Sequence, residues 1–381
     1  MTFDELGLHS SLLPLLKKNN FSSPTPIQEK GIPAILSQND VLGIAKTGSG
    51  KTASFVLPIL TLLQRLPKKE KSREIDVLVL VPTRELAVQV ADVFNEYGKA
   101  LPNPIKTMSV YGGVSINPQM KTMFGTNILV ATPGRLLDLV SHNAIELSKV
   151  RALVLDEADK MLNLGFQDEM NEIFELLPEI RQNLLFSATL SKDLESIKNI
   201  LLDDPKVIKI ASEDDDIESI NLTGYFVTED RKGPLLRYLI KQNEMDQVLV
   251  FTSSAQKADR VAAKLTKNGI DAFPIHGKKS QGARQSALEA FKTGKIKVLV
   301  ATDLLSRGID IVGLPFVINY ELPRSPKDFI HRVGRTGRAG ENGLAISFVD
   351  REEVKHFKVI LKKMDRYIDM IDSDGFELHG F

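Results

Sequence analysis

Short apolar runs rich in β-branched residues recur along the chain, and amphipathic helical stretches separate them. Runs that are apolar throughout fit strands whose two faces are both covered by other parts of the protein. Alternation of such strands with helices predicts parallel sheets joined by crossover helices. The pattern occurs twice, so we predict two similar α/β domains in tandem, with strands at Val41–Ala45, Val77–Thr83, Thr107–Gly112, Asn127–Thr132, Ala152–Asp156 and Leu184–Ala188, and then at Thr223–Val227, Val248–Thr252, Ala272–His276, Lys297–Thr302, Val317–Tyr320 and Ala345–Phe348.

The length of 381 residues also fits two ordinary domains better than one. We assign residues 1–210 to the first domain, 211–221 to a linker and 222–381 to the second domain. The linker assignment rests on Ser212–Glu218, which is acidic and poor in core residues. A regulatory contact with a basic surface is the alternative for this charge run. We expect the last residues, Ile371–Phe381, to be loosely held.

Composition excludes several classes of protein. The chain has no cysteine, which excludes disulfides, thiolate zinc sites and cysteine nucleophiles. It fits a reducing cytoplasm, which is the location we expect. No stretch approaches the roughly 20 apolar residues of a membrane span, and the N-terminus lacks the positive region of a secretory signal. Because 49 basic residues balance 49 acidic ones, any nucleic-acid site must be local and geometrically organised.

A glycine-rich segment, AKTGSGKT, follows the first apolar run and precedes a helical pattern at Ala53–Leu63. This strand–loop–helix order is what a phosphate-binding loop requires. Its glycines let backbone N–H groups turn toward phosphate oxygens, and the helix N-terminus adds the positive end of its dipole. Alanine stands at the first glycine position of the general pattern, and a glycine-rich surface turn is the alternative. The candidate phosphate-binding residues are Ala45, Thr47, Gly48, Ser49, Gly50, Lys51 and Thr52.

Two acidic residues, Asp156 and Glu157, follow another apolar strand. Asp156 is suited to hold Mg²⁺, directly or through water, and Glu157 to position and deprotonate an attacking water. Two acids after a strand also occur by chance. Together with Lys51 for the β- and γ-phosphates and the Thr52 hydroxyl for Mg²⁺, they predict hydrolysis of a nucleoside triphosphate.

The tetrapeptide Asp156–Asp159 reads D-E-A-D, and with it the chain resembles the DEAD-box RNA helicases. The bacterial RhlE-like branch of that family looks closest. The resemblance covers Phe3 to about Asp350, with the motifs in the family's order. It implies two tandem RecA-like domains, each a mainly parallel sheet flanked by helices. It also implies an ATP-dependent RNA helicase that uses ATP and Mg²⁺.

An upstream segment, Phe21–Gln28, resembles the family's adenine-reading motif. Gln28 offers one donor and one acceptor group that can pair with the edge of adenine. Phe3 stands where the family keeps a base-stacking aromatic ring, and simple core packing is the alternative. Asn20 replaces the usual glycine before the second aromatic residue, Phe21. The motif implies a preference for ATP over GTP.

Three loops that follow predicted strands resemble the family's RNA-backbone motifs of the first domain. Loops at the carboxyl ends of parallel strands line one edge of the sheet. Arginines there supply charge and glycines allow close approach to a phosphate, although each loop alone is an ordinary turn sequence. The residues assigned to RNA in this domain are Pro82, Thr83, Arg84, Gly112, Gly113, Thr132, Pro133, Gly134 and Arg135.

Segments of the second domain resemble further motifs of the family. The residues assigned to RNA here are Thr252, Gln281, Arg284, Thr302 and Asp303, and those assigned to the nucleotide are Gly308 and Asp310. Ser306 stands where the family most often has alanine. Ser253 and Ser254 stand where it usually has a basic or larger polar residue. These three differences from the family pattern affect the predicted contacts with RNA, and they do not affect the prediction of ATP hydrolysis.

An arginine-rich segment, HRVGRTGR, resembles the motif that carries the family's arginine fingers. The resemblance assigns Arg335 and Arg338 to the charge that develops on the γ-phosphate. A solvated arginine cluster is the alternative. Ser187, Thr189 and His331 resemble residues that couple the nucleotide and RNA sites. An arginine finger is worth about 10³–10⁵ in rate, or about 4–7 kcal/mol, so we expect closure of the two domains on ATP and RNA to control hydrolysis.

The expected partner is single-stranded and duplex RNA, with little sequence preference because the contacts are backbone loops. A duplex step is worth about 1.4 kcal/mol, so one closure can disrupt a few base pairs without processive travel. An ATP-gated RNA clamp or assembly scaffold with little unwinding keeps the same residues, and a DNA-directed helicase is a third reading. Ribosomal or RNA-decay assemblies are family partners, and a monomer is the default.

Overall fold

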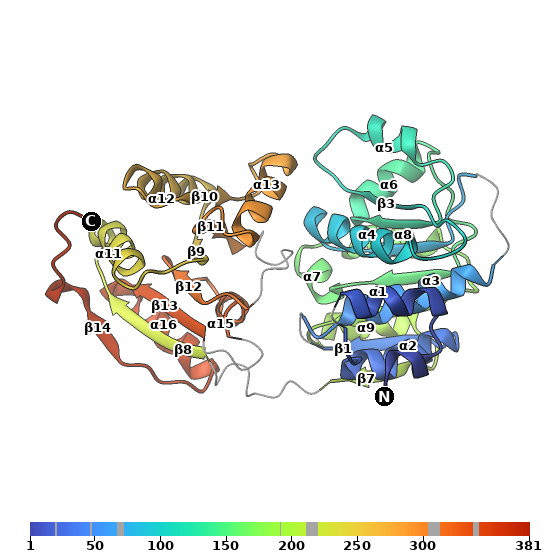
Figure 1. Cartoon of the computed structure of the whole chain (residues 1–381), viewed down its shortest axis with the longest axis horizontal. Helices are drawn as coiled ribbons and strands as arrows, with labels where there is room; N and C mark the ends of the chain where they lie inside the picture. The colour runs from blue at the N-terminus through green and yellow to red at the C-terminus, as the bar shows by residue number, and fades with distance from the viewer. Residues whose placement is uncertain are drawn as a thin grey trace. The chain divides into compact units, whose positions relative to one another are not determined.

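The computed structural model describes residues 1–19, 21–45, 48–66, 72–190, 192–210, 220–303, 313–337 and 343–381, without the side chains of Lys192 and Asp193. The chain forms two compact units, Met1–Ser212 and Glu213–Phe381. Each unit contains its own parallel sheet with helices on both faces (Figure 1). The prediction of two tandem α/β domains is therefore confirmed.

The first unit has a seven-stranded sheet in the order β3-β4-β2-β5-β6-β1-β7, and all neighbouring strands are parallel. Non-consecutive neighbours require crossover connections, which the intervening helices supply. All six strands predicted for this unit are present. The strands are β1 (Val41–Ile44), β2 (Val77–Leu80), β3 (Thr107–Val110), β4 (Ile128–Ala131), β5 (Ala152–Leu155), β6 (Gln182–Ser187) and β7 (Lys206–Lys209).

Helices cover both faces of this sheet, which explains why its central strands are apolar throughout. Along β2, Val77 and Val79 face one hydrophobic cluster, and Leu78 and Leu80 face the other. The first cluster includes residues of η1 (Phe3–Leu6), η2 (Ser10–Leu12), α1 (Leu13–Lys18), α2 (Pro26–Leu36), α3 (Lys51–Gln64) and α4 (Arg84–Gly98). The second includes residues of α6 (Pro133–Ser141), α7 (Ala158–Asn163), α8 (Gln167–Glu175) and α9 (Lys192–Leu201), and partly buried residues of α5 (Ile116–Thr122) pack against it.

The second unit repeats this plan with a seven-stranded parallel sheet in the order β10-β11-β9-β12-β13-β8-β14. All six strands predicted for it are present. The strands are β8 (Ile220–Phe226), β9 (Val248–Thr252), β10 (Ala272–Ile275), β11 (Val298–Thr302), β12 (Phe316–Asn319), β13 (Gly343–Val349) and β14 (Met370–Asp372).

Two core layers again lie on opposite faces of the sheet. One face packs against α11 (Glu229–Gln242) and α12 (Ala255–Lys267). The other packs against α13 (Gln281–Lys292), α15 (Pro326–Val333) and α16 (Val354–Lys363). Two short 3-10 helices, η3 (Arg351–Glu353) and η4 (Ser373–Gly375), complete the described part of this unit.

Hydroxyl side chains start several of the helices at the carboxyl edges of the two sheets. Thr83 Oγ1 accepts a hydrogen bond from the backbone of Leu86 at the start of α4. Ser254 and Ser280 cap α12 and α13 in the same way. Such caps satisfy backbone N–H groups that the first helical turn leaves without partners. The caps therefore define where these helices begin at the carboxyl edges of the sheets.

Two edge strands, β7 and β14, are absent from the sequence prediction. In β7 only Ile208 is buried, because lysines and the exposed Val207 occupy the other positions. Lysines are common on edge strands, where they prevent pairing with other chains. The strand β14 has three residues and pairs with β8 from Met370 to Asp372. Neither segment has the continuous apolar run that identifies a central strand.

The expectation that Ile371–Phe381 is loosely held is wrong. Its first two residues lie in β14, and the Phe376 ring packs edge-on against Tyr225 and Tyr238. Phe381 packs against the same Tyr238 with ring centroids 5.2 Å apart. Aromatic contacts of this geometry stabilise beyond the area they bury. A short segment with two aromatic rings thus docks on α11 and β8.

The linker expected at residues 211–221 extends too far at its C-terminal end. Ile220 and Asn221 belong to β8, where they pair with Gly343 and Leu344. The remaining linker residues, 211–219, lie outside the described residues. Among the described helices, none is long and apolar enough to cross a membrane.

Candidate active site

The strand order sorts the predicted segments of the first unit into two groups. The phosphate loop follows β1, the acidic pair follows β5 and the predicted coupling residues Ser187 and Thr189 lie at the end of β6 and just after it, and these three strands are neighbours in the sheet. The segments predicted for RNA follow β3, β4 and β2, which are also neighbours. Because all these strands are parallel, the loops share the carboxyl edge, where ligands of open α/β sheets bind. Sequence order alone does not reveal this separation into two halves.

The phosphate loop joins the end of β1 to the start of α3. Gly48 and Gly50 have positive φ angles of 81° and 92°, which L-residues with a Cβ rarely adopt. The Lys51 ammonium group is buried and donates a hydrogen bond of 2.6 Å to the Ala45 carbonyl. Thr52 follows in the first turn of α3. The glycines and the helix start therefore have the geometry that a phosphate-binding loop needs.

Gln28, the predicted adenine reader, is bonded to this loop. Its Oε1 accepts from the Thr25 backbone at 3.0 Å, and its Nε2 donates to the Gly50 carbonyl at 3.1 Å. The side chain is completely buried. A Cβ at Gly50 would lie only 2.4 Å from Gln28 Nε2. Gln28 thus supports the loop as well as standing beside it, which sequence reasoning did not anticipate.

The two aromatic residues assigned to adenine differ in exposure. Phe3 is 5% exposed and belongs to the hydrophobic core of the first unit. Phe21 is 36% exposed, and its ring stands edge-on to that of Phe3 with centroids 6.4 Å apart. Core packing, the alternative for Phe3, therefore describes its surroundings, and Phe21 has the more accessible ring.

The acidic pair after β5 is almost completely buried. Asp156 is 3% exposed, and its Oδ1 accepts from the Glu157 backbone at 2.9 Å. Burial, and then the neighbouring Glu157 carboxylate, raise the pKa of Asp156 from 3.8 to about 6, while Lys51 and Lys160 oppose the rise. Glu157 has a left-handed backbone with φ 54°, which is uncommon for a residue other than glycine. Strain of this kind is typical of functional sites.

Two buried carboxylate oxygens of this group, Glu157 Oε2 and Asp159 Oδ1, have no hydrogen-bond partner among the described residues. The other oxygen of Glu157 accepts from Lys160 Nζ at 2.6 Å. Buried oxygens without partners are costly unless a ligand, ion or water satisfies them. The orphaned oxygens therefore mark this edge as a place where such groups bind.

The two hydroxyl residues after β6 connect to the acidic group. Thr189 Oγ1 donates to Asp159 Oδ2 at 2.9 Å. Ser187 Oγ donates to the Thr189 carbonyl at 2.8 Å, and the Thr189 backbone returns a bond of 3.3 Å to Ser187 Oγ. The expected bond between these hydroxyls and the acidic motif is therefore present, through Asp159.

The loops predicted for RNA in the first unit are braced by their own arginines. Arg84, at the start of α4, lies so close to Gly113 that a Cβ there would be 1.7 Å from its Nη2. Arg135 is 7% exposed and donates from Nη2 to the Val114 carbonyl at 2.8 Å. Arg135 therefore holds the loop after β3 by a hydrogen bond, and the Arg84 guanidinium packs closely against the same loop. The other residues of the set precede α4, precede or begin α6, or lie in that loop: Pro82, Thr83, Thr132, Pro133, Gly134 and Gly112.

The second unit shows a similar grouping. Thr252 ends β9, Thr302 ends β11, and the neighbouring β10 leads to α13, which begins at Gln281. Thr252 is completely buried, and its Oγ1 donates to the Ser254 carbonyl at 3.3 Å. The buried Arg284 donates to Gln281 Oε1. The buried side chains of Thr252 and Arg284 thus bind neighbouring residues at the carboxyl edge of the second sheet.

Asp303, predicted to contact RNA, forms a two-point ion pair with Arg332. The Asp303 oxygens accept from Arg332 Nε at 2.5 Å and Nη2 at 2.8 Å. Arg332 is 1% exposed and lies 4.9 Å above the Phe251 ring. Planar guanidinium groups suit such paired and stacked contacts. Arg332 joins the ends of β9 and β11 to α15, a role that the sequence motif alone did not indicate.

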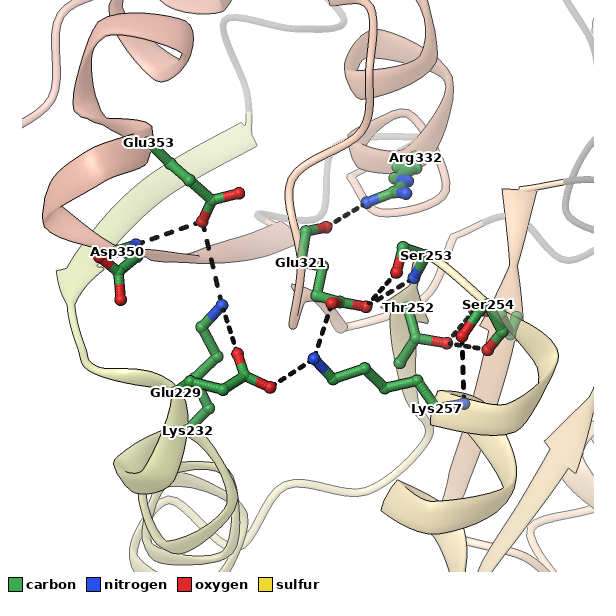
Figure 2. Close-up of polar contacts among 11 residues, drawn as sticks. Glu229, Lys232, Thr252, Ser253, Ser254, Lys257, Glu321, Arg332, Asp350 and Glu353 are labelled. Carbon is green, nitrogen blue, oxygen red and sulfur yellow. Dashed lines mark hydrogen bonds and ion pairs between the residues drawn. The ribbon is translucent and has the colours of Figure 1, made fainter.

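A polar network beside this pair centres on Glu321, just after β12 (Figure 2). Ser253 donates to Glu321 Oε2 from both its backbone and its hydroxyl, each at 2.7 Å. Lys257 Nζ binds Glu321 Oε1 at 2.8 Å and also pairs with Glu229, and Arg332 Nη1 donates to the Glu321 carbonyl at 2.6 Å. Burial tends to raise the pKa of the Glu321 carboxyl, but the Lys257 and Ser253 bonds hold it below its ordinary value.

The arginine-rich segment begins at the end of α15. His331 lies in the last turn of this helix, and Arg335 follows it with 5% exposure. The Arg335 carbonyl accepts from the Leu314 backbone at 3.0 Å. Four predicted site residues lie outside the described residues: Thr47, Gly308, Asp310 and Arg338.

Comparison with known proteins agrees with this geometry. The family model described as DEAD/DEAH box helicase matches residues 25–197, and the helicase conserved C-terminal domain matches residues 231–340. The DEAD-box ATP-dependent RNA helicase RhpA of Helicobacter pylori is 38% identical over 372 residues, which cover 97% of this chain and 74% of that protein. The helicase CshA of Bacillus cereus is 38% identical over 98% of this chain and 70% of its own length.

Solved structures show the same likeness. Dbp5 of S. cerevisiae, bound to RNA and ADP BeF3, has a TM-score of 0.84 and 30% identity, covering 98% of this chain and 96% of that one. A DEAD box protein of Methanococcus jannaschii has a TM-score of 0.55 and 37% identity over 97% and 99% of the two chains. Similarity over nearly the whole length, joined to the phosphate loop and the buried acids, defines a nucleoside-triphosphate hydrolase with two tandem RecA-like domains. The chain belongs to the DEAD-box family of ATP-dependent RNA helicases.

Proposed function

We propose that this ATP-dependent RNA helicase couples ATP binding and hydrolysis to local, non-processive unwinding of RNA duplexes and remodelling of RNA–protein complexes. The observation that carries the proposal is the buried group of Lys51, Asp156 and Glu157 at the carboxyl edge of the first sheet. The Thr189–Asp159 bond ties this group to the segment after β6. A change at the acidic group during hydrolysis could therefore alter the position of the loop after β6, which carries Thr189.

The residues present fit an ATP-bound Mg²⁺ ion. Thr52 offers a hydroxyl beside the phosphate loop, and Asp156 offers a buried carboxylate. No group of three or more acidic, histidine or cysteine side chains in the described part of the chain could hold a metal ion. This is expected for Mg²⁺, which takes one or two protein ligands and completes its shell with phosphates and water. When bound, the ion would neutralise charge on the phosphates.

Each protein group has a distinct role in this proposal. Lys51 exchanges its bond to the Ala45 carbonyl for the β- and γ-phosphates. Glu157 accepts a proton from the attacking water, for which its Oε2 is available. From the second domain, Arg335 and Arg338 stabilise the charge that develops on the γ-phosphate. Gly308 and Asp310 complete the nucleotide contacts, and His331 couples them to RNA.

RNA would bind along the loops after β3, β4 and β2 in the first domain and after β10, β11 and β9 in the second. These are turns with backbone groups, threonines and glycines, and they are suited to sugar and phosphate contacts. We expect little sequence preference for that reason. Because ATP and RNA would each engage both domains, each should help the other to bind.

We also propose that the protein belongs to the RhlE-like branch of the family and acts as a cytoplasmic monomer. We further propose that it works with ribosomal or RNA-decay assemblies. The resemblance of its motifs to those of the family supports these proposals. The separate domain assignments, with the first ending near residue 210, are supported by the two compact units.

The first experiment is ATP hydrolysis with and without single-stranded RNA, with Glu157→Gln as the inactive control. We expect strong stimulation by RNA that is lost in the variant. Hydrolysis indifferent to RNA would contradict the proposed coupling. Strand displacement with matched RNA and DNA duplexes then separates the alternatives. A clamp or scaffold would hydrolyse ATP without displacing a strand, and a DNA-directed enzyme would prefer the DNA duplex.

A further inference from the structure

The candidate general base, Glu157, carries a partner of its own. Lys160, one turn further along in α7, places its Nζ 2.6 Å from Glu157 Oε1. The two side chains are 8% and 9% exposed. Ion pairs on a surface contribute little, because water screens them and both side chains lose freedom. This pair is buried, so the position of each charged group depends strongly on the other.

The local backbone explains how the pair forms. Glu157 precedes the first residue of α7 in a left-handed conformation. Residues three apart at a helix start lie on the same side, so the lysine can fold back onto the carboxylate. The helix is also anchored at its first turn by the Thr189–Asp159 bond. Lys160 therefore projects from a fixed element.

The pair uses only one of the two carboxylate oxygens. Oε1 accepts from Lys160, whereas Oε2 is buried and has no hydrogen-bond partner among the described residues. A carboxylate held at one oxygen has a defined rotamer and presents the other oxygen in a fixed direction. Catalytic groups need such support, since a displacement of about 1 Å can cost about 100-fold in rate.

We propose that Lys160 is a positioning residue that holds Glu157 by Oε1 so that Oε2 takes the proton of the attacking water. In that step the water oxygen bonds to the γ-phosphorus, and the bond from the γ-phosphorus to the bridging oxygen breaks. ADP leaves with that electron pair, and the proton stays on Oε2. Lys160 transfers no proton and touches no phosphate in this scheme. The inference rests on the proposed role of Glu157.

The test is the steady-state kinetics of ATP hydrolysis at saturating RNA. Lys160→Met should lower kcat roughly 10- to 100-fold, while KM for ATP stays within about threefold because the phosphate loop is unchanged. Lys160→Arg keeps a cation that can bind the carboxylate, so it should restore most of kcat. A kcat of Lys160→Met within twofold of the parent, or higher than the parent, would overturn the inference.

The second unit offers a matched control. Lys232 is also buried, and it pairs with Glu229 three residues earlier through a contact of 3.2 Å. Lys232→Met removes the same buried charge from an i,i+3 pair in α11, in which the Glu229 side chain is 58% exposed and Glu353 lies 3.9 Å away as a second partner. It should leave kcat and KM for ATP unchanged. An equal loss of kcat in both variants would show a general effect of a lost buried lysine and would overturn the positioning role.

If Lys160→Met folds poorly, a loss of kcat alone would not identify its cause. A double-mutant cycle with Glu157 tests whether the two side chains interact. Unfolding free energies are measured for the parent, Lys160→Met, Glu157→Gln and the double variant. If Lys160 acts through Glu157, its substitution should cost clearly less stability in the Glu157→Gln background. Equal costs in the two backgrounds would overturn the inference. Loss of hydrolysis in Glu157→Gln with normal kcat in Lys160→Met would refute the inference but leave the proposed function intact.

Discussion

Thr189 Oγ1 donates a hydrogen bond of 2.9 Å to Asp159 Oδ2, and so joins residues 30 positions apart in the chain. Thr189 follows β6, and Asp159 lies in the first turn of α7, which also carries Lys160. Asp159 is 3% exposed, and its Oδ1 has no hydrogen-bond partner among the described residues. The Thr189 hydroxyl therefore supplies a hydrogen bond that stabilises the buried Asp159 carboxylate.

Thr189→Val should lower the free energy of unfolding by about 1–3 kcal/mol, the cost of leaving a buried acceptor without its donor. Valine has nearly the same shape, so packing is preserved. Thr189→Ser keeps the hydroxyl and should retain most of the stability. Urea unfolding followed by circular dichroism measures both variants. Equal stability of the valine variant and the parent would show that water replaces the lost bond.

The central strands and the phosphate loop could be predicted from the sequence because each follows from local pattern. An apolar run such as Val77–Leu80 identifies a strand covered on both faces, and the glycines at 48 and 50 identify the loop that follows another. The edge strand Lys206–Lys209 escaped prediction because only Ile208 is buried. Its pairing with β1 is decided by the sheet, which sequence pattern does not reveal.

Arg332 and Glu321 could not be predicted because their importance comes from tertiary contacts. Arg332 occurs among other arginines, and only the fold shows that it binds Asp303 inside the unit. Glu321 resembles any acid after a strand, yet Ser253, Lys257 and Arg332 all meet it. For Lys160, spacing on a helix was the available signal, since it lies three residues after Glu157.

The contact between Ser253 and Glu321 leads to a prediction about RNA. Glu321 holds the turn after β9 through two bonds, next to Thr252 at the edge proposed to bind RNA. Glu321→Ala should raise the RNA concentration for half-maximal hydrolysis roughly 3- to 10-fold, equivalent to about one lost hydrogen bond. The kcat at saturating RNA should change less.

Lys297→Met is the control for that measurement. It breaks an exposed ion pair with Asp246 at the opposite end of β11. The RNA dependence of hydrolysis should match that of the parent. If Glu321→Ala and Lys297→Met shift the RNA dependence equally, the Ser253 turn has no special part in RNA binding.

The pKa of Asp156 gives a prediction about pH. Burial, and then Glu157, raise this pKa from 3.8 to about 6. A carboxyl whose pKa is higher in the folded state favours folding while it is protonated. That contribution is complete below about pH 4 and is lost as the pH rises through 6. Ionised Asp156 therefore destabilises the nucleotide-free protein at neutral and alkaline pH.

Asp156→Asn removes this ionisation and should be the more stable protein at pH 8, by up to roughly 3 kcal/mol. The advantage should shrink as the pH falls from 8 to 5. Urea unfolding of both proteins, nucleotide-free and with a chelator, measures the difference. Parallel stability curves across that range would show that the Asp156 carboxyl keeps an ordinary pKa.

The phosphate loop depends on the absence of a side chain at Gly50. Its φ of 92° disfavours an L-residue by about 1–2 kcal/mol, and a Cβ would lie 2.4 Å from Gln28 Nε2 and 2.7 Å from Thr25 Oγ1. We expect Gly50→Ala to raise KM for ATP at least about 10-fold, since either the loop or Gln28 must move. Adding Gln28→Ala relieves one contact but not the backbone strain, and it also removes the proposed adenine reader and its bond to the Gly50 carbonyl, so it should not restore affinity. Gly233→Ala in α11 is the control, because an added Cβ there would lie 3.5 Å from its nearest neighbour. It should keep the parental KM for ATP. A parental KM in Gly50→Ala would show that the loop accepts the side chain without cost.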